Sequence, residues 1–167
     1  MKYYYFDASV LVKAYLWEVG TEDVREVLRD VRTAPPSSTV VTSSIAFVEA
    51  VSAVSRRAFA GEITADEAKD VWQRLLSDFG EYTVVEPELA LLQGAAGLTR
   101  RHRLRALDAI HLATGLTVRA DIPVGADFRF ASTDRRLNVA ATAELFDVFN
   151  PDSPVPPGTS TPVTPSE

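Results

Sequence analysis

The sequence contains no cysteine and only two histidines among its 167 residues. The absence of cysteine excludes disulfide bonds and thiolate zinc sites, and it fits a reducing compartment. Two histidines give little support to a His-based catalytic triad. Long apolar runs are missing as well: no stretch of about 18 uncharged apolar residues occurs, so no membrane span is expected.

The N-terminal stretch MKYYYFDASVLVKAYL is not interpreted as a signal peptide. It contains Asp7 and Lys13, and no small-residue cleavage site follows a clean apolar core. Together with the absence of cysteine, this predicts a cytoplasmic protein without a membrane partner.

The sequence also lacks the short motifs of several large enzyme classes. It has no GxxxxGK[ST] phosphate loop, no GxGxxG fingerprint, no HExxH zinc motif and no GxSxG nucleophile elbow. The composition, 46% apolar and 24% charged, is ordinary for a globular protein, and the length fits one domain. The net charge of −6 argues against a protein that coats nucleic acid, but it leaves open an enzyme that acts on nucleic acid.

Strand-like and helix-like segments alternate along the first 150 residues. Strands are predicted at 3–6, 39–42, 82–85, 128–132 and 145–149, from β-branched and aromatic runs. Helices are predicted at 9–17, 21–32, 44–60, 64–79 and 134–143. A further helix is predicted to start at 87, and the helical run LRALDAIHLA is predicted to continue to about 118. This alternation predicts an α/β fold with a mostly parallel sheet.

The chain is divided into a domain over residues 1–150 and a tail over 151–167. The last segment, PDSPVPPGTSTPVTPSE, is rich in proline, serine and threonine. Such a composition cannot build a core, so the tail is expected to be flexible and dispensable for activity.

Two acidic residues are predicted to follow strands. Asp7 comes at the end of the first strand, and Asp134 comes just after the strand in FRFAS. In parallel α/β sheets, ligands bind outside the carboxyl ends of the strands. Both carboxylates are therefore expected at the edge of the sheet where sites form.

Two further acidic residues lie within apolar helical runs. Asp108, in LRALDAIHLA, is predicted mid-helix between Leu104 and Leu112, its apolar neighbours four positions away. Glu49, in SSIAFVEAVSAV, is also predicted mid-helix, with Arg56 as the nearest basic residue. Isolated buried carboxylates are costly, so each needs a partner or a raised pKa.

Two interpretations of these four acids are open. In the first, an arginine or a helix N-terminus satisfies each acid separately. In the second, they converge, and a divalent cation neutralises the cluster. Hard oxygen ligands without cysteine favour Mg²⁺ or Mn²⁺ over zinc, and such a site suits hydrolysis of phosphodiester bonds. His111, three residues after Asp108, could pair with it or transfer protons, but a packed scaffold histidine bonded to a carbonyl is favoured.

Four segments resemble PIN-domain proteins, in particular the toxin ribonucleases of VapBC-type toxin–antitoxin pairs. They are YYFDASVLVK, SSIAFVEAVSAV, LRALDAIHLATGL and FASTDRRLNVAA, with LFDVFNP closing the domain. The resemblance covers about residues 1–151 in the family's order and spacing, and DAIHLA is its most specific piece. The tail is longer than the family domain requires.

The resemblance implies a PIN-like fold, a parallel sheet flanked by helices in three layers, and a Mg²⁺- or Mn²⁺-dependent endoribonuclease. It implies a catalytic metal site of four acids, with Ser132 as a supporting hydroxyl and Asp127 as a loose match. It also implies an RNA substrate, a homodimer and a cognate antitoxin. The four acids that match the family's positions are Asp7, Glu49, Asp108 and Asp134.

Two rival functions stay open at this stage. One is a non-catalytic PIN scaffold that binds RNA or a protein partner, and the other is the same chemistry acting on DNA. Basic side chains at the rim, such as Arg101, Arg103 or Arg135, are candidates for holding phosphates. The sequence does not name the RNA target or decide between one metal ion and two.

Overall fold

The computed structural model describes residues 1–33 and 36–153. Its strands are β1 (Lys2–Phe6), β2 (Ser38–Ser43), β3 (Thr83–Val85), β4 (Asp127–Ala131) and β5 (Asp147–Phe149). Its helices are α1 (Ala8–Lys13), α2 (Thr21–Val31), α3 (Ile45–Phe59), α4 (Ala65–Phe79), α5 (Leu89–His102), α6 (Ala106–Asp121) and α7 (Arg135–Ala143). No helix in the described part of the chain is long and apolar enough to span a membrane.

The strands form one five-stranded sheet in the order β3-β2-β1-β4-β5, and every pairing is parallel. In the register, Phe6 of β1 lies beside Thr42 of β2 and Ala131 of β4. The carboxyl ends of the three central strands therefore meet at one edge. Because β2 lies on one side of β1 and β4 on the other, the strand order reverses there, and such a switch point is where α/β sheets bind ligands.

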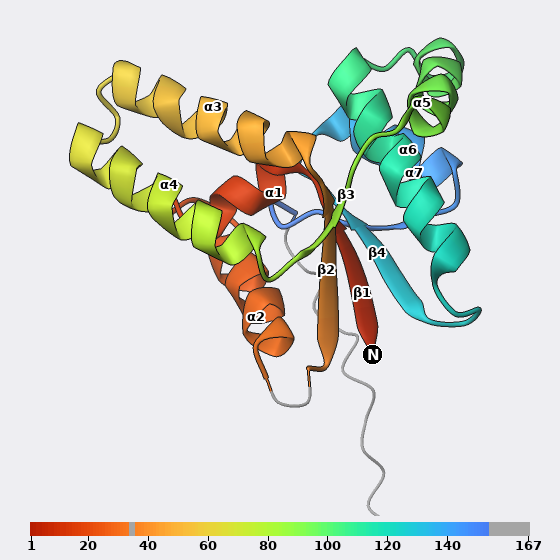
Figure 1. The fold of residues 1–167 in the computed structure, drawn as a ribbon, viewed down its shortest axis with the longest axis horizontal. Helices are drawn as coiled ribbons and strands as arrows, with labels where there is room; N and C mark the ends of the chain where they lie inside the picture. The colour runs from red at the N-terminus through yellow and green to blue at the C-terminus, as the bar shows by residue number, and fades with distance from the viewer. Residues whose placement is uncertain (34–35, 154–167) are drawn as a thin grey trace, which may run out of the picture.

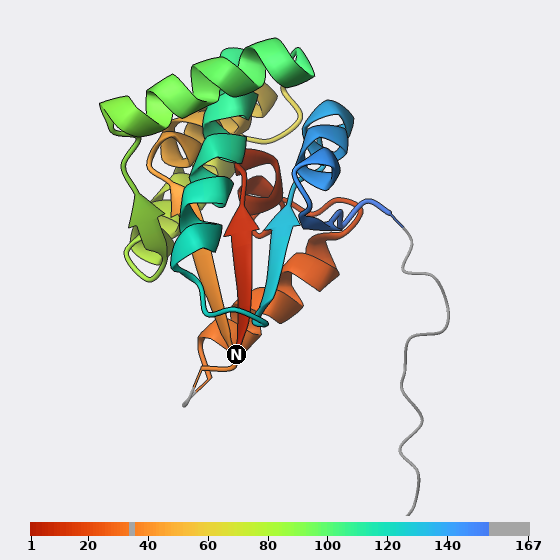
Figure 2. The same cartoon turned by 90° about the vertical axis from the view of Figure 1, so that its right-hand side faces the viewer.

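Helices cover both faces of this sheet, which gives the predicted three layers (Figures 1 and 2). On one face, Tyr5 and Phe130 pack against Leu112 of α6 and Leu137 of α7. On the other face, side chains of β1 and β2 pack against α1 and α2. The alternation of side chains along β1 explains both contacts, since neighbouring tyrosines point to opposite faces.

The predicted start of the helix through LRALDAIHLA is wrong. Helix α5 ends at His102, Arg103 takes a left-handed conformation with φ 54°, and α6 begins only at Ala106. Asp108 therefore lies in the first turn of α6 and not mid-helix. An arginine gives no sequence signal for a left-handed turn, because glycine or asparagine usually occupies that conformation.

The segment after β5 packs onto the connection between α1 and α2. Pro151 is buried, and the carboxylate of Asp152 accepts from Lys13 Nζ at 2.7 Å. Gly20, with φ 79°, leaves room for the backbone of Pro151. Residues 151–153 of the predicted tail thus contact the domain, whereas 154–167, for which flexibility is predicted, lie outside the described residues.

Candidate active site

Asp7 forms the buried floor of the candidate site. It follows β1 directly and caps the N-terminus of α1, and only 4% of it is exposed. Its Oδ1 accepts hydrogen bonds from Ser9 Oγ at 2.6 Å and from the Val10 backbone N–H at 3.0 Å. Burial nevertheless raises the pKa of Asp7, although His111 and the hydrogen bonds lower it in part. The protein alone therefore does not fully compensate this charge.

Ser132 connects Asp7 to the second strand-end acid. Its buried hydroxyl accepts from the Asp134 backbone N–H at 3.0 Å, and its interaction with the Asp7 carboxyl lowers the pKa of Asp7 in part. Asp134 caps α7, since its Oδ1 accepts from the Leu137 N–H at 2.9 Å, and the residue is exposed. The edge of the sheet thus carries a buried and an exposed carboxylate with one serine between them.

Glu49 reaches the same region from α3. Its Oε2 lies 2.7 Å from Nε2 of His111 on α6, and Nδ1 of that histidine lies 2.7 Å from the Tyr5 hydroxyl on β1. The sequence favoured a scaffold histidine bonded to a carbonyl. The structure instead shows His111 bonded to a candidate site residue, while Arg56, the nearest basic residue in sequence, bonds Ser52. Sequence spacing could not reveal this pairing, because α3 and α6 are far apart in the chain.

Asp108 faces Asp134 from the first turn of α6. Burial raises the pKa of Asp108, the negative charge of Asp134 raises it further, and His111 and the backbone N–H of Arg105 lower it in part. Asp7, Asp108 and Asp134 therefore all lie at helix N-termini, where carboxylates are favourable. The raised pKa values of Asp7 and Asp108 show that the helix ends alone do not balance these charges.

Asp108→Asn is expected to stabilise the protein without metal above about pH 4. The pKa of Asp108 in the folded state is raised above its ordinary value of 3.8, so the full stability of the protein is present below pH 3.8. It falls as pH rises through the raised folded value. Asparagine removes this loss, so the gain in melting temperature in chelator should grow from pH 3.5 to pH 7. A pH-independent difference would contradict the assignment.

The types of side chain in the candidate site are those that bind a hard divalent cation, but their present positions do not form a metal site. Carboxylates and hydroxyls are the ligands that Mg²⁺ and Mn²⁺ prefer. The hydroxyl of Ser43, next to Asp7 at the end of β2, is buried and has no hydrogen-bond partner among the described residues. Within residues 1–33 and 36–153, however, no three His, Asp or Glu side chains are grouped as a metal site. A shared ion therefore requires side-chain rotation, which the exposed Asp134 can make.

Two residues named from the sequence lie elsewhere or are already engaged. Asp127 starts β4, four residues before its carboxyl end and so about 13 Å from the candidate site, and it pairs with Arg129 at 3.1 Å. Arg101 donates to Glu144 at 2.8 Å. Arg103 and Arg135 are exposed and make no side-chain hydrogen bond within the described residues, so they are the stronger rim candidates.

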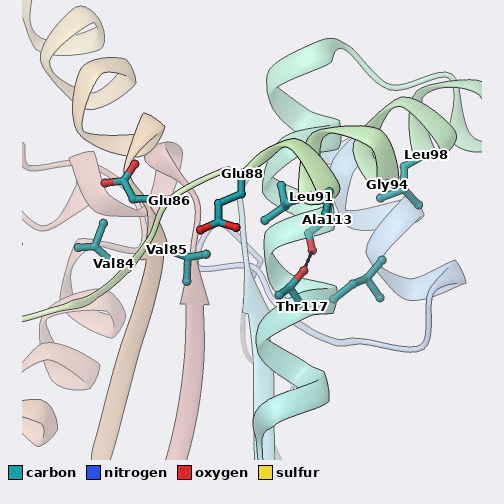
Figure 3. A pocket seen from close by; sticks show the side chains of 11 residues that line it. Val84, Val85, Glu86, Glu88, Leu91, Gly94, Leu98, Ala113 and Thr117 are labelled. Carbon is teal, nitrogen blue, oxygen red and sulfur yellow. Dashed lines mark hydrogen bonds between the residues drawn. The ribbon is translucent and has the colours of Figure 1, made fainter.

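A separate cavity of about 700 Å³ lies between the β3–α5 connection and α6 (Figure 3). Its lining is largely apolar and includes none of the four candidate acids. Its carboxylates are Glu86 and Glu88, and Glu86 accepts from Ser44 Oγ at 2.7 Å. The candidate chemistry therefore lies at the strand ends and not in this cavity.

The fold and the strand-end acids define the class, and the comparisons agree: the chain belongs to the PIN-domain family, whose model matches residues 4–142. The relatives include Ribonuclease VapC45 of Mycobacterium tuberculosis (strain CDC 1551 / Oshkosh) and Ribonuclease VapC49 of strain ATCC 25618 / H37Rv. Each is 34% identical over 140 residues, which cover 83% of this chain and 89% of the relative. The predicted resemblance is confirmed.

Solved structures confirm the predicted fold. PAE2754 from Pyrobaculum aerophilum aligns with a TM-score of 0.61 at 14% identity, covering 91% of this chain and 92% of that one. A toxin–antitoxin complex from Klebsiella pneumoniae aligns with a TM-score of 0.56 at 15% identity, covering 90% and 98%. At these identities the likeness concerns the fold.

Proposed function

We propose that the protein is an endoribonuclease that hydrolyses RNA phosphodiester bonds with Mg²⁺ or Mn²⁺, and that it is the toxin of a toxin–antitoxin pair. The observation that carries this proposal is that Asp7 and Asp134 follow neighbouring parallel strands at the switch point of the sheet, where Asp108 faces Asp134 and the pKa values of Asp7 and Asp108 are raised. Relatives named Ribonuclease VapC, 34% identical over most of the chain, support it.

Each acid has a proposed role as a metal ligand. Asp7 and Asp108 are the principal ligands, because they are the acids that the protein leaves under-compensated. Glu49 and Asp134 complete the site, and Ser132 keeps Asp7 and Asp134 in register. A bound divalent cation would supply neutralisation of the carboxylates, a lowered pKa of water and stabilisation of charge on the phosphate. The N-termini of α6 and α7 add favourable dipoles for an anionic substrate.

Metal removal tests this proposal on the wild-type protein. Cleavage of a panel of single-stranded and structured RNAs is followed with Mg²⁺, with Mn²⁺ and with chelator. Cleavage that needs either cation and stops in chelator is the expected result. Cleavage that continues in chelator contradicts the metal site.

The alternative is a PIN scaffold that binds RNA or a protein partner without turnover. All four acids are present in the sequence, which disfavours a scaffold. The two functions differ in one observation: a scaffold binds RNA from the same panel without shortening it under any metal condition.

The proposed partners are an RNA substrate, a cognate antitoxin and a second copy of the chain, in the cytoplasm. The solved toxin–antitoxin complex from Klebsiella pneumoniae, which has the same fold, supports the antitoxin. An open reading frame for a small DNA-binding protein next to this gene, and co-purification of its product, would test it. Sedimentation of the purified chain would test the homodimer.

Arg103→Gly is expected to raise stability and weaken RNA binding at once. Arg103 occupies a left-handed turn with φ 54°, which costs an L-residue about 1–2 kcal/mol, and glycine recovers part of this, roughly 0.5–1 kcal/mol. If its guanidinium holds a phosphate, affinity should fall and the slope of log K against log salt should shrink by about 0.7. Binding is measured in an Asp7→Asn background.

Leu145→Gly is the matched control for this experiment. Leu145 has φ 65° and is also exposed, but it carries no charge. Both variants should therefore gain similar stability, and only Arg103→Gly should lose RNA affinity. Equal affinities would remove Arg103 from the phosphate-binding rim.

A further inference from the structure

A buried hydrogen-bonded chain links the core to Glu49. Tyr5 is fully buried in β1 and His111 is 3% exposed in α6. The Tyr5 hydroxyl lies 2.7 Å from His111 Nδ1, and His111 Nε2 lies 2.7 Å from Glu49 Oε2. Tyr5 in turn stacks on Phe130 with ring centroids 5.0 Å apart, so the phenol is held by the core.

The donors and acceptors in this chain have one consistent order. A carboxylate only accepts, so His111 must donate from Nε2 to Glu49. In neutral imidazole the other nitrogen, Nδ1, is then an acceptor, and the Tyr5 hydroxyl donates to it. Burial raises the pKa of Tyr5 well above its usual value, so the phenol keeps the proton that this order requires.

The chain also fixes one helix of the candidate site relative to another. Glu49 is on α3, whereas His111 follows Asp108 by three residues on α6. A hydrogen bond from His111 to Glu49 therefore ties the position of the Glu49 carboxylate to the helix that carries Asp108. A side chain as long as glutamate otherwise samples several rotamers and would lose entropy on binding a ligand.

We propose that Tyr5 and His111 are positioning residues: His111 holds the Glu49 carboxylate toward the cation site, and the Tyr5 hydroxyl holds the His111 ring through Nδ1. This inference rests on the proposed metal-dependent function. Groups that hydrogen-bond to a metal ligand and orient it typically contribute 10–100-fold to metal affinity or activity. His111 is then neither a proton-transfer catalyst nor a passive core residue.

The test compares Tyr5→Phe with Tyr4→Phe in the full chain. Both variants remove one hydroxyl from a buried tyrosine of β1, but Tyr4 packs on the opposite face of the sheet. The ¹⁵N chemical shifts of the His111 ring report its tautomer in the metal-free protein, and His102 is the only other histidine in the spectrum. Mn²⁺ affinity, kcat and KM for RNA complete the comparison.

In the wild type and in Tyr4→Phe, His111 is expected to carry its proton on Nε2. In Tyr5→Phe the ¹⁵N resonance of Nδ1 should shift because that nitrogen loses its hydrogen bond, Mn²⁺ affinity and kcat should each fall about 10-fold, and KM should stay within about 2-fold. His111→Gln, which keeps an N–H donor, should retain more activity than His111→Phe.

Two failures are distinguishable in this experiment. Wild-type protein that neither binds Mn²⁺ nor cleaves RNA contradicts the proposed function itself. Wild-type protein that does both, while Tyr5→Phe matches Tyr4→Phe in the Nδ1 resonance, metal affinity and kcat, overturns only the positioning role of Tyr5 and His111.

Discussion

Asp7→Asn is expected to lower RNA cleavage about 10³-fold, because a catalytic cation contributes several kcal/mol to stabilising the transition state. The same variant should leave the metal-free protein at least as stable as the wild type. Asparagine can still accept the hydrogen bonds from Ser9 and Val10 and cap α1. It also removes a buried charge that the fold does not fully compensate. Single-turnover cleavage rates with Mg²⁺ and melting curves in chelator measure the two effects.

Asp127→Asn is the control for this experiment. It removes a carboxylate from the same sheet, but at the amino end of β4, where Asp127 pairs with Arg129. Its cleavage rate should equal that of the wild type, since an exposed ion pair contributes little. If Asp7→Asn protein cleaves RNA at the wild-type rate, the proposed metal site is contradicted. A large loss of stability in chelator would instead assign Asp7 a structural role.

Gly20→Ala is expected to destabilise the domain by about 2–5 kcal/mol. Gly20 has φ 79°, a conformation that costs an L-residue about 1–2 kcal/mol. A Cβ there would also overlap the carbonyl oxygen of Pro151 and lie 2.7 Å from its Cβ. Relief requires the segment that carries Asp152 to move away from Lys13, and overpacking of this kind adds about 1–3 kcal/mol. Urea unfolding followed by circular dichroism measures the change.

Gly61→Ala separates the two contributions. Gly61 has φ 73°, but nothing lies within 4 Å of a Cβ added there. This variant should therefore show the backbone cost alone, about half of the Gly20→Ala effect or less. If the two substitutions cost the same, the contact between Gly20 and Pro151 contributes nothing to stability.

The strand-end acids were the part of the site that sequence could place best. A short β-prone segment followed by Asp7, and another followed by Asp134, predicts both positions, because parallel strands share a carboxyl edge. The helix predicted over 64–79 is likewise confirmed, since Thr64 and Glu67 form a capping box at the start of α4. These features depend on neighbours within a few residues, and local sequence encodes them.

The partners of Glu49 and Asp108 could not be predicted in the same way. Glu49 bonds His111, which is 62 residues away, and only tertiary packing brings α3 to α6. Asp108 was expected mid-helix because the apolar period runs through Leu104, yet Arg103 breaks the helix in a conformation that arginine rarely adopts.

The central place of β1 has a consequence for how the protein is made. Asp7 leaves the ribosome long before Ser132, but the strand pairing that brings the two together joins Phe6 to Ala131 and closes a loop of about 125 residues. Non-local parallel pairing of this kind forms slowly and late. A growing chain therefore carries an incomplete set of acids until almost the whole domain has been synthesised, and an interrupted translation product would be harmless to the RNA around it.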